Sequence, residues 1–145
     1  MVMELANQGD LLEHIQRRRV LSDDRSRHIF GQIIDGVEYL HNNGVFHRDL
    51  KCENILLNTG YKVKISDFGF AREWWEAHAL CRTFCGSAAY ASPEILQGIP
   101  YDPHVADIWS LGVILFIMVS HCFSLFLPHS SMCSMGSGPS DFLTS

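Results

Sequence analysis

The chain has 145 residues, of which 47% are hydrophobic and 19% charged, and its net charge is −5. This length falls within the usual single-domain range of roughly 50–250 residues, and the apolar fraction excludes a chain that is disordered throughout. The acidic balance, with a single dense basic run at residues 17–19, argues against nucleic-acid binding. Five cysteines, an odd number without a C-x-x-C pair, do not form a disulfide framework, so we expect a reducing, cytoplasmic setting.

Two helices are predicted in the first third of the chain. Asp10 can cap a short helix that runs to about residue 19. The Ser-Asp-Asp sequence at residues 22–24 can cap a longer helix, which the sequence Asn42-Asn43-Gly44 ends. The apolar residues of this longer helix recur at steps of three and four, which indicates a core-facing stripe: Ile29, Phe30, Ile33, Ile34, Val37 and Leu40.

Short strands and loops follow. The apolar runs at 55–57 and 63–65 flank the turn sequence Asn-Thr-Gly at 58–60, which predicts a β-hairpin. Residues 67–92 show no sustained periodicity and are predicted to form a long loop, and loops of that length inside compact domains usually serve function. Residues 93–96 can start a helical turn, and residues 107–119 are predicted to form an apolar helix.

The segment at residues 111–127 contains no Asp, Glu, Lys or Arg. A membrane-spanning helix needs about 20 apolar residues, but a helix that is apolar all round is equally typical of the buried centre of a domain. Gly, Ser and His residues interrupt this segment and Pro128 ends it, so we favour burial over a membrane span. Residues 128–145 are rich in serine, carry one charge and show no periodicity, which indicates a disordered tail.

One run of eight residues holds most of the chemistry: His47-Arg48-Asp49-Leu50-Lys51-Cys52-Glu53-Asn54. Asp67-Phe68-Gly69 begins eighteen residues after Asp49. Each residue alone is typical of a turn, a solvated surface or a core. Their joint spacing, after a predicted helix and around a predicted hairpin, matches the catalytic loop and metal-binding motif of protein kinases.

The residue types fit phosphoryl transfer, which needs metal ions, a positioned hydroxyl and neutralised phosphate charge. Asp49 is expected to orient the attacking hydroxyl or accept its proton. Asn54 and Asp67 are expected to hold magnesium through hard oxygen ligands. The ammonium of Lys51 is expected to lie against the transferring phosphate as a point charge.

On these motifs the chain resembles the C-terminal lobe of a eukaryotic serine/threonine protein kinase over residues 1–119. Ser-Pro-Glu at 92–94 extends the resemblance, and Asp-Ile-Trp-Ser-Leu-Gly at 107–112 resembles the central buried helix of that lobe. The resemblance implies a mainly α fold with short β-hairpins, ATP and Mg²⁺ as cofactors, and a protein substrate phosphorylated on serine or threonine. Residues 120–145 depart from the family and are expected to form a divergent, disordered tail.

The resemblance assigns roles to further residues. Residues 1–10 resemble the hinge between the two lobes, with Met3 as gatekeeper. The remaining residues assigned to the nucleotide are Glu4 and Ala6 at the adenine, Asp10 at the ribose and Leu56 under the adenine.

Two assigned residues lie in the long loop. Thr83 matches the activation-loop phosphosite, whose phosphate would pair with Arg48. Ser87 stands at the position where serine/threonine kinases place a Ser or Thr that faces the substrate hydroxyl. Residues 83–90 and 96–101 look most like those of the testis-specific serine/threonine kinases, and residues 9–12 and 51–54 agree with that subfamily.

Some parts of a kinase domain are not recognisable in the sequence. No Gly-rich loop and no Val-Ala-Ile-Lys strand precede the hinge, and the later helices of the lobe are not recognisable after Val119. The resemblance therefore predicts a truncated kinase domain, with the N-lobe and the late helices missing and with apolar surface exposed on the central helix.

Two interpretations of function remain open. The chain represents a serine/threonine protein kinase, or it is a catalytically inert kinase-like fragment that acts as an interaction module for a regulatory or chaperone partner. A membrane-anchored fragment is a weaker third interpretation.

Overall fold

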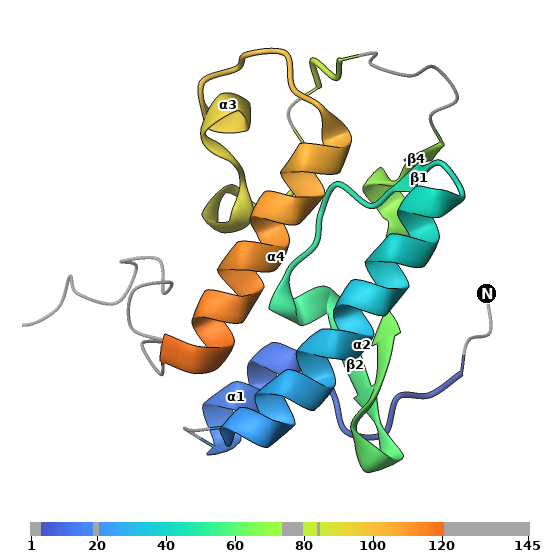
Figure 1. The fold of residues 1–145 in the computed structure, drawn as a ribbon, viewed down its shortest axis with the longest axis vertical. Coiled ribbons are helices and arrows are strands. Elements are labelled where there is room, and N and C mark those ends of the chain that lie inside the picture. The colour runs from blue at the N-terminus through green and yellow to red at the C-terminus, as the bar shows by residue number, and fades with distance from the viewer. Residues whose placement is uncertain (1–3, 19–20, 74–79, 84, 121–145) are drawn as a thin grey trace, which may run out of the picture.

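The computed structural model describes residues 4–18, 21–73, 80–83 and 85–120 (Figure 1). The predictions for Met3 and for the tail from residue 121 lie outside the described residues. The helices and strands are α1 (Leu11–Arg18), α2 (Asp23–Asn42), β1 (Val45–Phe46), β2 (Ile55–Asn58), β3 (Lys62–Ile65), β4 (Arg72–Glu73), α3 (Pro93–Leu96) and α4 (Pro103–Ser120).

The helix ends follow the local sequence. The side chain of Asp10 accepts a hydrogen bond from the backbone N–H of Glu13 at 2.8 Å, which confirms the predicted cap of α1. Ser22 occupies the corresponding position before α2, but its side chain makes no capping hydrogen bond. Helix α2 ends as predicted, because the N–H of Gly44 returns to the carbonyl of His41 at 2.9 Å with a positive φ of 69° at Gly44.

The strands form two small antiparallel sheets. The pairing of β2 with β3 confirms the predicted hairpin, with Ile55 opposite Ile65. The second sheet pairs β1 with β4, with Val45 opposite Glu73. The sequence did not predict β1 and β4, because strands of two residues carry no periodic signal. The described residues are thus mainly helical with short antiparallel strands.

The core lies where α2 and α4, which run side by side in Figure 1, meet α1 and the hairpin. Its largest fully buried apolar side chains come from all of these elements and, for Leu50, from the loop after β1: Leu11, Ile29, Ile33, Leu50, Ile55, Leu57, Ile114 and Met118. The predicted stripe of α2 is only partly covered, because Ile34 remains 44% exposed.

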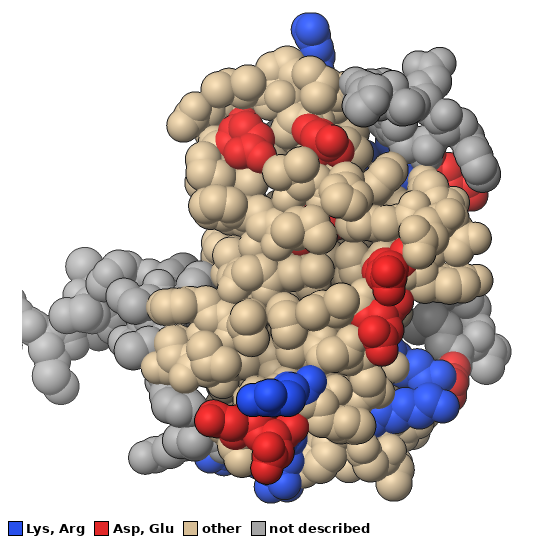
Figure 2. Space-filling view, in the orientation of Figure 1, with Lys and Arg blue, Asp and Glu red and all other residues tan. Residues whose placement is uncertain are grey.

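Helix α4 begins at Pro103, four residues before its predicted start, and is buried on one face only. Leu111, Ile114, Ile117 and Met118 face the core, whereas six large apolar side chains are exposed: Val105, Ile108, Trp109, Leu115, Phe116 and Val119. Figure 2 shows broad uncharged surface where α4 runs in Figure 1, with charged side chains beyond its ends and along α2.

Helix α4 is the one described helix long and apolar enough to cross a membrane, with a mean hydropathy of 1.6. Buried core helices of soluble proteins meet the same criteria, so this is weak support for a membrane span. The buried face agrees with the predicted packing into a core, and the exposed face agrees with the predicted apolar surface.

Candidate functional site

The site is centred on Asp49, which is 5% exposed and lies in the loop after β1. One carboxylate oxygen accepts hydrogen bonds from the backbone N–H of Ser87 at 2.9 Å and from its hydroxyl at 3.2 Å. The other oxygen lies 2.7 Å from the ammonium of Lys51, which also donates to the Ser87 hydroxyl at 3.1 Å. The structure therefore brings together three predicted site residues that lie up to 38 positions apart in the chain.

Asn54 lies directly beside Asp49. Its buried amide nitrogen donates to the Asp49 carbonyl at 2.9 Å and approaches the carboxylate at 3.4 Å. Both contacts use the nitrogen, so the amide oxygen is the atom that a cation would use.

Asp67 is brought next to this group by the backbone. The N–H and hydroxyl of Ser66 both donate to the carbonyl of Asn54, at 2.9 and 3.0 Å. Asp67 follows with a left-handed φ of 61°, and its exposed carboxylate accepts a hydrogen bond from the N–H of Gly69 at 3.3 Å. A non-glycine residue in this region costs about 1–3 kcal/mol and is concentrated at functional sites.

The donor set of Asn54 and Asp67 suits magnesium, which prefers oxygen ligands. No group of three or more His, Cys, Asp or Glu side chains is placed to hold a metal within the described ranges. A magnesium ion here would therefore take its other ligands from water and phosphate, as magnesium commonly does in nucleotide-binding sites.

Asp107 of α4 anchors the backbone of the loop that carries Asp49. Its buried carboxylate accepts hydrogen bonds from the backbone N–H groups of His47 at 3.0 Å and Arg48 at 2.8 Å. The Nε2 atom of His41 lies 2.9 Å from the same carboxylate. Arg48 has a positive φ of 68°, so this double anchor holds a strained backbone immediately before Asp49.

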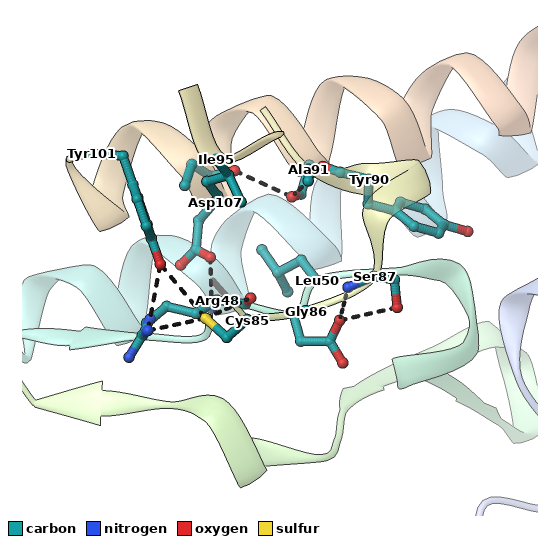
Figure 3. A pocket seen from close by; sticks show the side chains of 13 residues that line it. Arg48, Leu50, Cys85, Gly86, Ser87, Tyr90, Ala91, Ile95, Tyr101 and Asp107 are labelled. Atoms are coloured by element: carbon teal, nitrogen blue, oxygen red, sulfur yellow. Dashed lines mark hydrogen bonds between the residues drawn. The ribbon is translucent and has the colours of Figure 1, made fainter. Parts of the chain in front are cut away.

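The side chain of Arg48 lies in a second cluster, shown in Figure 3. Its guanidinium donates to the Cys85 sulfur at 2.9 Å and to the Tyr101 hydroxyl at 3.4 Å, and that hydroxyl donates to the Thr83 carbonyl at 3.0 Å. Burial raises the pKa of Tyr101 to about 12. Arg48, Cys85 and Tyr101 line a cavity together with Asp49 that measures about 10 Å³, room for about one water molecule.

The pKa of the Arg48 guanidinium is raised above its ordinary value. Burial acts to lower the pKa of its guanidinium, but the Tyr101 hydrogen bond and the nearby cysteines outweigh it and raise the pKa. Thr83 is exposed, and its backbone carbonyl accepts a hydrogen bond from Tyr101, which also contacts Arg48. The pairing of a Thr83 phosphate with Arg48 stays a prediction.

Three of the residues predicted to contact the nucleotide lie within residues 4–10, and the fourth, Leu56, lies on β2 beside this segment. Asp10 pairs with Leu56 of β2 through backbone, and the N–H of Leu57 donates to the Gly9 carbonyl at 2.9 Å. Ala6, four residues before Asp10, is half-buried. Glu4 is exposed, and its ion pair with Lys64 at 2.9 Å lowers the pKa of its carboxyl.

Sequence reasoning missed the positioning roles of two residues. Asp107 carried a signal, since it is the single charged residue of an otherwise uncharged helix. Tyr101 carried none, because its contacts with Arg48 and Cys85 depend on the backbone pairing of Cys81 with Tyr101 across the loop.

Comparison with known proteins agrees with these motifs. The family model of the protein kinase domain matches residues 1–133. Testis-specific serine/threonine-protein kinase 2 of Mus musculus is 57% identical over 122 residues, which cover 81% of this chain and 34% of the relative.

Two human proteins are also similar. Testis-specific serine/threonine-protein kinase 3 of Homo sapiens is 48% identical over 126 residues, covering 86% of this chain and 46% of the relative. NUAK family SNF1-like kinase 2 of Homo sapiens is 51% identical over 118 residues, which cover 81% of this chain and 19% of the relative. This chain thus spans less than half the length of each of these relatives. The family match extends over most of the sequence and includes the Asp49 site, so the chain belongs to the protein kinase domain family.

Proposed function

We propose that the chain carries the catalytic-loop part of a serine/threonine protein kinase, which transfers the γ-phosphate of ATP to a serine or threonine of a protein substrate. The observation that carries this proposal is the convergence of Lys51 and Ser87 on the Asp49 carboxylate within 2.7–3.2 Å. Both carboxylate oxygens are already bonded, so a substrate hydroxyl has to share or replace one of these bonds to reach Asp49.

Each of the three side chains has a distinct task. Asp49 orients the substrate hydroxyl and takes its proton as the new bond to phosphorus forms. Lys51, held between Asp49 and Ser87, offsets negative charge on the transferring phosphate. Ser87 positions the substrate hydroxyl beside Asp49, which favours serine and threonine over the longer tyrosine.

Asn54 and Asp67 are the residues that would hold magnesium. Bound magnesium supplies charge neutralisation of the ATP phosphates. The hydrogen bond from the Asn54 amide nitrogen to the Asp49 carbonyl orients the amide oxygen, and Ser66 fixes the spacing of the two ligands. The residues proposed for the nucleotide itself are Glu4, Ala6, Asp10 and Leu56.

The finer assignments are part of the same proposal. Residues 1–119 correspond to the C-terminal lobe from the hinge to the central helix, with 120–145 as a divergent tail, and the subfamily is that of the testis-specific serine/threonine kinases. The identity of 57% to the mouse relative supports this subfamily. Phosphorylation of Thr83 orders its loop, because the phosphate pairs with Arg48. The proposed location of the protein is the cytoplasm.

A segment exchange tests the function in a complete kinase. Residues 4–120 replace the matching segment of mouse testis-specific serine/threonine-protein kinase 2, and phosphate transfer to a basic protein is measured at varied Mg²⁺. We expect the exchange to retain activity, and Asp67→Asn to raise the Mg²⁺ concentration needed for half-maximal rate. An inactive exchange protein that is folded and binds ATP would contradict the proposal.

An inert interaction module is the second candidate, and the exposed apolar face of α4 favours it, because large exposed apolar surfaces mark interaction sites. Purified chain, Mg-ATP and a basic protein substrate separate the two candidates. Phosphate transfer that Asp49→Asn abolishes excludes the inert module. If the purified chain transfers no phosphate while the exchange protein is active, the result favours the inert interaction module.

A further inference from the structure

An apolar groove runs between α2 and α4 at the end where α4 terminates. It measures about 490 Å³, within the range of about 300–1,000 Å³ for clefts that bury drug-sized ligands. Its lining comes from these two helices alone: Asp23, Ser26, Arg27, Phe30, Gly31, Ile34, Leu115 and Val119. Ile34, Leu115 and Val119 are 44%, 37% and 50% exposed, so the structure leaves apolar side chains of both walls uncovered.

The sequence that leaves α4 begins at this groove. Val119 lines it, α4 ends at Ser120, and residues 121–145 continue the chain. Seven residues reach at most roughly 24 Å when extended, at about 3.3–3.6 Å each. The α2 wall from Asp23 to Ile34 is about 16 Å long at about 1.5 Å per residue, so residues 121–127 are long enough to cover the whole groove.

The composition of residues 121–127 matches the groove. The segment carries no Asp, Glu, Lys or Arg, and four of its seven residues are Phe or Leu. In an extended conformation Phe123, Leu125 and Leu127 lie on one face, because side chains alternate between the two sides of an extended chain. The charged side chains of the lining, Asp23 and Arg27, are both exposed, and apart from the buried Ser26 the rest of the lining is apolar.

We propose that residues 121–127 fold back along the groove between α2 and α4 and insert Phe123, Leu125 and Leu127 into it. A second apolar depression on α4, lined by Trp109, Gly112, Val113 and Phe116, measures about 230 Å³. Its last lining residue precedes the end of α4 by one helical turn, so the α2–α4 groove is the nearer and larger site for the segment. Docking of this segment covers apolar side chains of both helices that the described residues leave exposed.

Disulfide trapping in the full 145-residue chain tests the contact. Cys133→Ser leaves Cys122 as the single thiol after residue 120, and the described cysteines at 52, 81 and 85 are buried. Arg27→Cys then places a thiol in the groove, and His28→Cys places one on the neighbouring, exposed position outside it. Under mild oxidation we expect the intramolecular bond to Cys122 to form roughly tenfold faster at position 27, because docking raises the effective concentration there.

Equal rates of disulfide formation at positions 27 and 28 would overturn the proposal. Disulfides that form only between chains would also overturn it, because the occupant of the groove would then be a second copy of the chain. A second measurement does not depend on the trapped bond. We expect Phe123→Asp with Leu125→Asp to increase the fluorescence of a bound hydrophobic dye several-fold at unchanged far-UV circular dichroism. Phe142→Asp, in the same tail, is the matched control and leaves dye binding unchanged. Unchanged dye binding in the double variant would also overturn the proposal.

Discussion

Replacement of Asp107 by asparagine is expected to destabilise the fold strongly, although the side chain keeps its shape. Asp107 is 1% exposed, and its two oxygens accept hydrogen bonds from two backbone N–H groups and face the His41 ring nitrogen. Asparagine has one oxygen and one NH₂ group. The NH₂ group must therefore face at least one of these two N–H donors, in the loop that carries Asp49.

The size of the effect follows from these contacts. A buried donor left without an acceptor costs about 1–3 kcal/mol, and a hydrogen bond to a charged group contributes about 1.5–3 kcal/mol. We expect Asp107→Asn to lower the free energy of unfolding by about 2–4 kcal/mol. Asp107→Ala is expected to cost more, since both backbone donors and His41 lose their acceptor.

Urea unfolding followed by far-UV circular dichroism measures this loss. Asp35→Asn, at an exposed position of α2, is the matched control and is expected to change the free energy of unfolding by less than about 0.5 kcal/mol. An Asp107→Asn variant as stable as the Asp35→Asn control would refute the anchoring role of Asp107.

Three further predictions concern other parts of the fold. Burial and nearby arginines lower the pKa of His14 below its ordinary 6.5, so protonation favours the unfolded chain. The free energy of unfolding should therefore fall as the pH drops below about 6.5. His14→Gln should flatten this pH dependence, as measured by urea titrations. Burial raises the pKa of Cys52 to about 12, so iodoacetamide at pH 8 should label Cys52 in urea but not in the folded chain; rapid native labelling would contradict its burial.

Gly86→Ala should destabilise more than Gly98→Ala, because both have positive φ but a Cβ at Gly86 would lie 2.7 Å from the Arg48 carbonyl; equal losses of unfolding free energy would exclude this clash.

The helices and the hairpin could be predicted from the sequence because local signals determine them. Apolar residues at steps of three and four located α2, Asp10 marked the start of α1, and Asn-Thr-Gly marked the turn between β2 and β3. The start of α4 was misplaced, since Pro103 at its first position was not used as a helix-start signal.

The candidate site was predicted as a set of residues but not as a geometry. Spacing in the motif placed Asp49, Lys51 and Asn54 in one loop, whereas the approach of Ser87 depends on a fold-back across the molecule that leaves no periodic pattern. The same limit applies to the Arg48–Cys85–Tyr101 cluster, which the backbone pairing between Cys81 and Tyr101 assembles.

The role of Asp49 is tested most directly by the rate of phosphate transfer in the exchanged kinase that carries residues 4–120 of this chain. Asp49→Asn should lower this rate by about 10²–10⁴-fold, the usual contribution of a general base, with Asp35→Asn as the matched control at the unsubstituted rate. A rate in the Asp49→Asn protein within a few-fold of that control would contradict the assignment of the Asp49 site to phosphoryl transfer.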